Sequence, residues 1–340
     1  MIDRHLDTGR RWKGIKMQVT VVVVTYNRRS MLESCLEKLM LYAHIRIIVI
    51  DNASSDGTKE YLDEISIPGA EQMTYVRLRC NEGGAGGFYW GIRLAYESGA
   101  DWIWLMDDDV EPLEGSLEAL LRHIDKPNVG FLCSSVRAAD GISSMNVPEI
   151  SVELVGANGN PSWDEWLDQG LVKVRRATFV SLLVSRAAVQ FCGLPNRRFF
   201  IWGDDSEYTE RLSKHGFIGL MVGESRVIHK RETEESLSIV YESSKKRISM
   251  MFYLYRNMLY VQVRNKKRLR AVAIAVRDIF RVLLYAPNAK FMRVKSVFMG
   301  LGAAFVSNLE NRKDWSVEEH ILEMRGRSLV LDCATSSILG

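Results

Sequence analysis

The sequence has few cysteines and no motif that pairs them. Only five cysteines occur among 340 residues, and none form the two-residue spacing of a redox or zinc motif. An odd number of scattered cysteines is not typical of a disulfide-bonded secreted protein. We therefore expect reduced thiols in a cytoplasmic protein without a structural zinc site.

Long uncharged hydrophobic runs are also missing. No window of about 18 residues is free of charged side chains, so we expect no transmembrane helix. Residues 1–16 are charged and have no apolar core, which argues against a signal peptide. We treat this segment as an N-terminal extension.

The signatures of two common nucleotide-binding classes are absent as well. In NEGGAGGF, residues 81–88, Gly84 and Gly86 fit a G-x-G pattern, but Tyr89 stands where the next glycine is required. The stretch also lacks the Gly-Lys-Ser/Thr of a P-loop. A nicotinamide enzyme and an NTPase are therefore disfavoured. The glycines by themselves fit either a tight turn or a backbone that approaches a phosphate or sugar.

An alternation of strand and helix patterns is present instead. Apolar runs at 19–26, 45–51, 73–78 and 101–109 predict strands buried on both faces, as in a parallel sheet. The stretches between them have apolar residues on one helical face. We therefore predict a Rossmann-like α/β fold, in which a mainly parallel sheet is flanked by helices, over residues 17–240.

The net charge of +3 is unevenly distributed along the chain. Residues 245–295 contain 14 Lys and Arg against one acid, Asp278, so the remainder is acidic. This composition predicts a helical, basic C-terminal region at 241–340 with an anionic partner. The sequence shows no nucleic-acid-binding module, so we expect no nucleic acid partner.

Within this region, residues 253–285 have the pattern of an amphipathic helix. Arg270, Arg277 and Arg281 share one helical face, and apolar residues fill the other. This pattern predicts a helix that lies on an anionic membrane surface. An ordinary helical subdomain with surface arginines is the alternative.

Three consecutive aspartates end the fourth predicted strand. Because side chains alternate along a strand, we expect Asp107 and Asp109 on one side and Asp108 on the other. Two carboxylates on one side suit Mg²⁺ or Mn²⁺, which could bridge a diphosphate. An acidic turn in solvent is the alternative. His229 closes a strand-like run and becomes a candidate third ligand beside such a site.

Two other strands end in polar residues, Thr25 and Asp51. Open α/β sheets bind ligands outside the carboxyl ends of their strands, so these residues should share an edge with the aspartates. Asp51 could accept hydrogen bonds from a base or ribose. Capping of the following turn by the Asp51–Asn52 pair is the alternative.

A second acidic cluster follows an aromatic run. Asp204 and Asp205 come shortly after Trp202, and Glu207 follows them. A carboxylate held near a metal-bound donor can act as a general base. Capping of the helix that begins there is a compatible alternative.

Together these motifs resemble the inverting, GT-A-fold glycosyltransferases of family 2. The resemblance covers about residues 17–232 and rests on VVVVTYNR, IIVIDNASSDGT, NEGGAGGF, LMDDDV and FIWGDDSEYTERL, followed by His229. The double glycines, the triple aspartate and the Trp before the Asp pair are most similar to bacterial galactofuranosyltransferases. Rhamnosyltransferases are close relatives. One departure is Gly203, which separates Trp202 from the aspartates.

The resemblance implies a role for each candidate residue. The nucleotide-sugar donor would be bound by Thr25, Asp51, Gly84, Gly86, Gly87 and Asp108. Mn²⁺ or Mg²⁺ would be held by Asp107, Asp109 and His229. The catalytic base would be Asp205, and the acceptor pocket would be formed by Trp202, Asp204 and Glu207.

The implied function is transfer of galactofuranose from UDP-galactofuranose to a lipid-linked saccharide in bacterial cell-surface polysaccharide synthesis, such as cell wall or O-antigen. The enzyme would act at the inner face of the cell membrane. A dTDP-rhamnose-dependent rhamnosyltransferase is the alternative. A sugar-nucleotide nucleotidyltransferase is disfavoured, because TYNRRS is not its glycine-rich signature. A non-catalytic nucleotide-sugar-binding protein is the alternative from another class. The oligomeric state is not predicted.

Overall fold

The computed structural model describes residues 11–12, 15–64, 72–156, 159–231, 237–309 and 321–326. Most of its strands form one sheet in the order β13-β5-β4-β3-β6-β11-β8-β12-β10-β9, and β7 pairs with β12. Of the N-terminal extension, the described residues form two short antiparallel strands, β1 (Arg11–Trp12) and β2 (Ile15–Lys16).

The first half of the sheet has the predicted parallel arrangement. Its strands are β3 (Val19–Thr25), β4 (Ile45–Asp51), β5 (Met73–Leu78) and β6 (Trp102–Asp107). Neighbours in the order β5-β4-β3-β6 are parallel. Every residue of β3 is buried, as expected for a β-branched strand covered on both faces.

The second half of the sheet is mixed. It contains β7 (Val110–Pro112), β8 (Val129–Arg137), β9 (Glu149–Ile150), β10 (Leu171–Arg176), β11 (Leu182–Ser185) and β12 (Ile218–His229). Strand β11 runs antiparallel to both β6 and β8, while β8 and β12 are parallel. The predicted α/β fold is confirmed, and the antiparallel strands begin where the regular alternation with helices ends.

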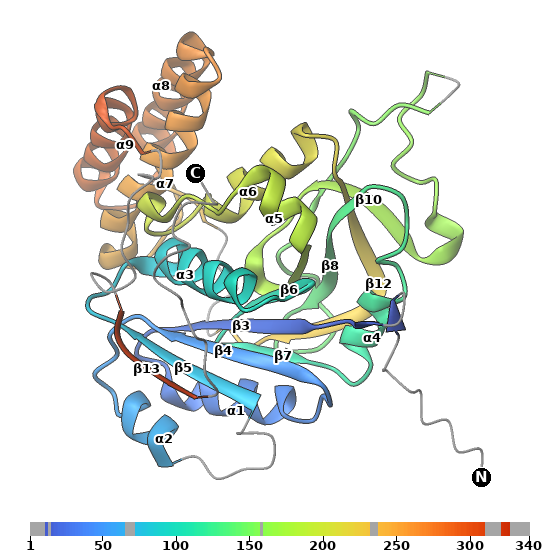
Figure 1. Cartoon of the computed structure of the whole chain (residues 1–340). Helices are drawn as coiled ribbons and strands as arrows, with labels where there is room; N and C mark the ends of the chain where they lie inside the picture. Colours follow the sequence, from blue (N-terminus) through green and yellow to red (C-terminus); the bar gives the residue numbers. More distant parts are fainter. Residues whose placement is uncertain are drawn as a thin grey trace.

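Helices cover both faces of the sheet (Figure 1). They are α1 (Arg29–Leu39), α2 (Thr58–Glu64), α3 (Gly83–Glu97), α4 (Ser116–Leu121), α5 (Arg186–Cys192) and α6 (Asp204–Lys214). Because side chains alternate along β3, Val21 and Val23 pack with residues of α1, whereas Val22 and Val24 pack with residues of α3.

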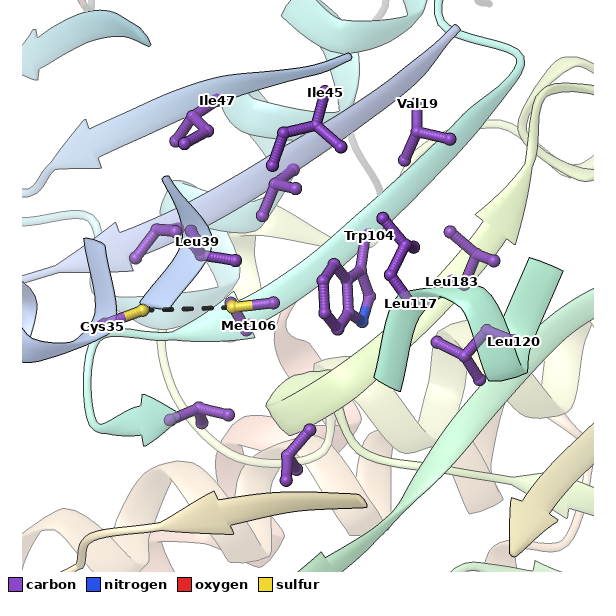
Figure 2. Close-up of a cluster of buried hydrophobic side chains, with 14 of the residues drawn as sticks. Val19, Cys35, Leu39, Ile45, Ile47, Trp104, Met106, Leu117, Leu120 and Leu183 are labelled. Atoms are coloured by element: carbon purple, nitrogen blue, oxygen red, sulfur yellow. Dashed lines mark hydrogen bonds between the residues drawn. The ribbon is translucent and has the colours of Figure 1, made fainter. Parts of the chain in front are cut away.

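The core on the α1 face surrounds Trp104 (Figure 2). Its indole N–H donates to the Ser181 hydroxyl at 2.9 Å, so this large side chain is buried with its polar atom satisfied. Nearby, the sulfur atoms of Cys35 and Met106 lie 4.0 Å apart. This packing fixes β6, the strand that ends at the aspartate run.

Three helices follow the sheet, namely α7 (Lys245–Arg264), α8 (Arg268–Tyr285) and α9 (Lys290–Val306). They share a third hydrophobic cluster, which also includes Ala85 of α3 and Phe199. The predicted single amphipathic helix at 253–285 is wrong. Helix α7 ends at Arg264, and α8 begins at Arg268. Between them Lys266 has a φ of 60°, which a continuous helix cannot accommodate.

The chain returns to the sheet after these helices. Strand β13 (Ile321–Gly326) pairs antiparallel with β5 at the sheet edge, which the sequence analysis did not predict. In the part of the chain that the structure describes, no helix is both long and apolar enough to cross a membrane. The rest of the predicted C-terminal region lies outside the described residues.

Candidate active site

The predicted polar edge of the sheet is present. In the register of the parallel strands, Thr25 lies opposite Asp51, and Val24 lies opposite Asp107. Three neighbouring strands therefore end at the same edge, as the sequence predicted.

Asp107, Asp109 and His229 come together at this edge. One ligand atom from each lies within 4.8 Å of the others, and His229 Nε2 is 3.1 Å from Asp109 Oδ1. The antiparallel pairing of β7 with β12 explains the contact, because it places His229 opposite Val110, the residue after Asp109. Two carboxylates and an imidazole suit Mn²⁺ and related divalent cations.

The second ring nitrogen of His229 supports this assignment. Nδ1 lies 2.9 Å from Asn146 Oδ1, so in the tautomer with a proton on Nδ1 the imidazole donates to this amide oxygen. In that tautomer Nε2, which lies 3.1 Å from Asp109 Oδ1, would offer its lone pair to a cation. Metal-binding histidines are usually held in this way by a partner on the other nitrogen. The residues present therefore fit a divalent cation.

Asp108 contacts Thr25 and shares Arg28 with Asp109. Its Oδ2 accepts from the Thr25 hydroxyl at 2.7 Å, and Arg28 Nη1 lies 3.3 Å from its Oδ1 and 2.6 Å from Asp109 Oδ2. Burial raises the pKa of Asp108 to about 6, and Arg28 opposes the shift. Thr25 and Asp108 therefore satisfy each other inside the protein, and their contact with a nucleoside stays a prediction.

The two carboxylates among the metal-ligand candidates, Asp107 and Asp109, have pKa values shifted in opposite directions. Burial, followed by the charge of Asp109, raises the pKa of Asp107 to about 7. For Asp109, the contacts with His229 and Arg28 outweigh burial and lower the pKa. Burial and the charge of Asp109 thus oppose ionisation of Asp107, and a bound cation would offset this repulsion.

Asp51 is fully buried, and both of its oxygens are hydrogen-bonded. Oδ1 accepts from the Ser54 amide at 2.8 Å, and Oδ2 accepts from the Tyr75 hydroxyl at 2.9 Å and from Arg77 at 3.3 Å. The contact with Ser54 corresponds to the turn-capping alternative, and the contacts with Tyr75 and Arg77 tie Asp51 to β5. Protein groups thus take up three of the acceptor positions of Asp51, and its contact with a nucleoside stays a prediction.

The glycine stretch forms the first turns of α3, and does not precede the helix as a separate loop. A Cβ on Gly86 would lie 2.3 Å from Glu82 Cβ, and one on Gly87 would lie 2.3 Å from Val24 Cγ1. Close packing therefore accounts for both glycines without a ligand. A Cβ on Gly84 would meet no atom within 4 Å, so Gly84 keeps the space that the predicted sugar contact needs.

Asp204 and Asp205 begin α6, directly after Gly203, whose φ is 89°. Burial, followed by the charge of Asp205, raises the pKa of Asp204 well above its ordinary value, and Asp107 contributes to the shift. Burial also raises the pKa of Asp205. Asp204 therefore lies close enough to Asp107 to feel its charge, and both acids of the pair stand in surroundings that favour proton uptake.

Glu207 is held by two arginines. Arg211 contacts both of its oxygens, at 3.1 and 3.2 Å, and Arg264 of α7 contacts Oε1 at 2.7 Å. These charges outweigh burial and lower the pKa of Glu207. The structure gives Glu207 an ion pair between α6 and α7. Its predicted role in the acceptor pocket gains no support from these contacts.

Sequence reasoning missed three residues of the site. Arg28 follows Asn27 in the first motif, so its position beside the strand end was a usable signal. Asn146 and Arg231 carried no such signal, because Asn146 lies in an irregular segment and Arg231 follows β12. Arg231 lies near enough to Asp109 and Asp107 to feel their charge, although burial lowers its pKa.

Comparison with known proteins identifies the domain that carries this site. Residues 20–164 match the model of glycosyl transferase family 2. This chain contains a glycosyl transferase family 2 domain. The match includes the first strand, the glycine stretch and the aspartate run, and the predicted family resemblance is confirmed.

Relatives of the glycosyl transferase domain include two kinds of sugar transferase. The chain is 30% identical over 209 residues to galactofuranosyltransferase GlfT1 of Mycolicibacterium smegmatis, covering 58% of this chain and 66% of that protein. It is 27% identical over 238 residues to N-acetylglucosaminyl-diphospho-decaprenol L-rhamnosyltransferase of Mycobacterium tuberculosis, covering 62% of this chain and 75% of that protein. The chain thus spans just under two thirds of the GlfT1 length.

A solved structure confirms the GT-A fold of the glycosyl transferase domain. Mannosyltransferase PcManGT from Pyrobaculum calidifontis, solved with GDP-Man and Mn²⁺, has a TM-score of 0.52 and 16% identity. The match covers 86% of this chain and 76% of that one.

Proposed function

We propose that this protein is a metal-dependent, inverting glycosyltransferase that moves galactofuranose from UDP-galactofuranose to a saccharide acceptor. The observation that carries the proposal is the convergence of Asp107, Asp109 and His229 at the sheet edge, near the acidic pair that begins α6. A cation site for a diphosphate and a candidate base are the two parts that such a reaction requires.

The residues divide the reaction between them. Asp107, Asp109 and His229 would hold Mn²⁺ or Mg²⁺, and such a cation offsets the negative charge that grows on a departing nucleoside diphosphate. Asp205 would take the proton of an acceptor hydroxyl while that oxygen attacks the anomeric carbon. The bond from that carbon to the diphosphate breaks on the opposite face, so the configuration inverts and no covalent enzyme intermediate forms.

Similarity to GlfT1 at 30% identity supports the galactofuranose donor. Similarity to the rhamnosyltransferase at 27% identity keeps dTDP-rhamnose as the alternative donor. The names of both relatives belong to sugar transferases, which disfavours a protein that only binds a nucleotide sugar.

The C-terminal helices support a lipid-linked acceptor at an anionic membrane. In Figure 1, α8 and α9 project away from the sheet. Each carries an exposed apolar stripe, formed by Leu269, Val272, Val276, Phe280, Leu283 and Leu284 on α8 and by Phe291, Phe298, Met299, Phe305 and Val306 on α9. An apolar stripe flanked by the arginines of α8 complements anionic lipid headgroups and acyl chains.

A donor panel tests the proposed function. Purified protein is incubated with UDP-galactofuranose, UDP-galactopyranose or dTDP-rhamnose, a lipid-linked saccharide and Mn²⁺, and the products are identified by mass spectrometry. We expect transfer from UDP-galactofuranose that EDTA abolishes and excess Mn²⁺ restores. Transfer from dTDP-rhamnose alone would select the alternative donor, and full activity in EDTA would contradict the metal site.

A further inference from the structure

The segment of residues 199–203, directly before the acidic pair Asp204 and Asp205, has a strained backbone. Phe200 has φ and ψ of 64° and −65°, and the Ile201 amide donates to the Phe199 carbonyl at 2.7 Å, which together form a γ-turn. Trp202 also has a positive φ, 63°. Bulky aromatic residues adopt such conformations only when their surroundings hold them there.

Two neighbouring side chains of α7 contact this segment: Arg256 Nη2 donates to the Phe199 carbonyl at 3.0 Å, and Asn257 contacts the segment three times. Asn257 of α7 is fully buried, and its Nδ2 lies 2.9 Å from the Phe199 carbonyl, 3.1 Å from that of Ile201 and 2.8 Å from that of Trp202. Its Oδ1 accepts from Arg256 Nε at 3.0 Å, which fixes the orientation of the amide. One amide group therefore ties together both ends of the strained segment.

The other side of the segment contacts the glycine-rich start of α3. The Ala85 amide donates to the Phe200 carbonyl at 3.1 Å. A Cβ on Gly83 would lie 2.0 Å from that same carbonyl oxygen, so a glycine is needed for this approach. The segment 199–203 is thus held between α3 and α7, and the acidic pair begins immediately after it.

We propose that Asn257 is a positioning residue for Asp204 and Asp205, so that helix α7 belongs to the transfer machinery as well as to the C-terminal bundle. The proposal rests on the proposed function, in which Asp205 is the base. By holding three carbonyl groups, the Asn257 amide fixes where α6 begins and therefore where the Asp205 carboxylate stands. Small displacements of a reacting group lower catalytic rates strongly while leaving donor binding in place.

The test compares three substitutions at one position. Asn257→Ala removes the amide, Asn257→Asp keeps the size but removes the N–H donors, and Asn257→Gln keeps an amide on a longer side chain. We expect kcat to fall about 10- to 100-fold in Asn257→Ala and Asn257→Asp, with partial recovery in Asn257→Gln. The Kd for UDP with Mn²⁺, measured by calorimetry, should stay within about twofold of the wild-type value, because the metal-ligand candidates lie on other elements.

Tyr255→Phe is the matched control. Its hydroxyl donates to Asp278 at 2.9 Å inside the same helical bundle, so the variant loses a buried hydrogen bond of α7 without affecting segment 199–203. Its kcat should match that of the wild-type protein. Equal losses of kcat in Tyr255→Phe and Asn257→Ala, or equal activity in Asn257→Asp and wild type, would overturn the proposal.

Hydrogen exchange separates this proposal from the proposed function. Peptides that cover residues 199–210 should exchange faster in Asn257→Ala and Asn257→Asp than in wild type, whereas peptides from β12 should not change. This readout needs no substrate, so it tests the role of Asn257 even if the donor panel shows no transfer. Unchanged exchange at 199–210 in a folded variant would contradict the positioning role.

Discussion

The carboxylate of Asp109 and the imidazole of His229 lie 3.1 Å apart, Oδ1 to Nε2. Asp109 lies in the turn between β6 and β7, and His229 is the last residue of β12. The ladder between β7 and β12 continues beyond the strands, because the Lys230 amide donates to the Asp109 carbonyl at 2.8 Å. Backbone pairing thus fixes the distance between two candidate ligands from different motifs.

Removal of the imidazole tests the metal site. We expect His229→Ala to abolish the stimulation of transfer by Mn²⁺, and calorimetry should show weaker binding of UDP in the presence of Mn²⁺. Asn146→Ala should reduce metal affinity by about 10- to 100-fold, because it releases the other ring nitrogen. Unchanged metal dependence in His229→Ala would show that the histidine is not a ligand.

The base is tested by Asp205→Asn, which keeps the shape of the side chain. Without a carboxylate to accept the proton, transfer should slow by about 10²- to 10⁴-fold. Binding of UDP and Mn²⁺, measured by calorimetry, should persist. Loss of that binding in a folded Asp205→Asn protein would assign Asp205 to the donor site instead.

The transfer activity of the wild-type protein should depend on pH through the Asp205 carboxylate. Burial raises the pKa of Asp205, and transfer requires the ionised form. The rate should therefore fall as pH drops through this raised pKa, at a higher pH than for an exposed aspartate. A rate profile in which activity persists down to the ordinary aspartate range would contradict the assignment.

Asp204, the acid next to Asp205, should lower the stability of the folded protein at neutral pH. The folded pKa of Asp204 is raised by burial and by Asp205, so its protonated form favours folding, and this contribution is lost as pH rises through the folded pKa. Asp204→Asn should therefore raise the Tm at pH 8 in the presence of EDTA. The gain should shrink toward pH 4, and an equal gain at both pH values would contradict a charge effect.

Glu207→Gln tests whether this residue has a structural or an acceptor-binding role. Loss of its charge beside Arg211 and Arg264 should lower the free energy of unfolding by about 1–3 kcal/mol, as measured by denaturant titration. The KM for the acceptor should not change. Glu97→Gln is the control, because Glu97 forms an i,i+4 ion pair with Arg93. This substitution should lower the free energy of unfolding by less than about 1 kcal/mol. A raised acceptor KM with unchanged stability would restore the acceptor-pocket role.

Membrane binding is tested with vesicles. The protein should sediment with vesicles that contain anionic phosphatidylglycerol but not with neutral phosphatidylcholine, and high salt should release it. Leu269→Glu and Phe291→Glu change side chains that are 88% and 82% exposed, and each should weaken binding. Leu41→Glu, at 79% exposure after α1, is the control. Equal binding by all three variants would place the contact elsewhere.

Local sequence patterns determined the first half of the fold. The runs that became β3, β4 and β5 could be located almost to the residue, because strands buried on both faces are mostly apolar. The aspartate run indicated a cation site for a similar reason, since adjacent carboxylates after an apolar strand need positive charge. The break at Lys266 and the edge strand β13 carried no comparable pattern.

Tertiary structure decided which groups the polar residues contact. Sequence alone left ligand binding and capping open for Asp51, and in the structure three protein groups donate hydrogen bonds to its carboxylate. Gly86 and Gly87 turned out to pack against neighbouring side chains. The sequence analysis did not single out Asn257, and only the fold places three carbonyl groups around its amide. Such roles depend on contacts between residues distant in sequence, which no local pattern encodes, whereas strand and helix patterns follow from the periodic burial of neighbouring residues.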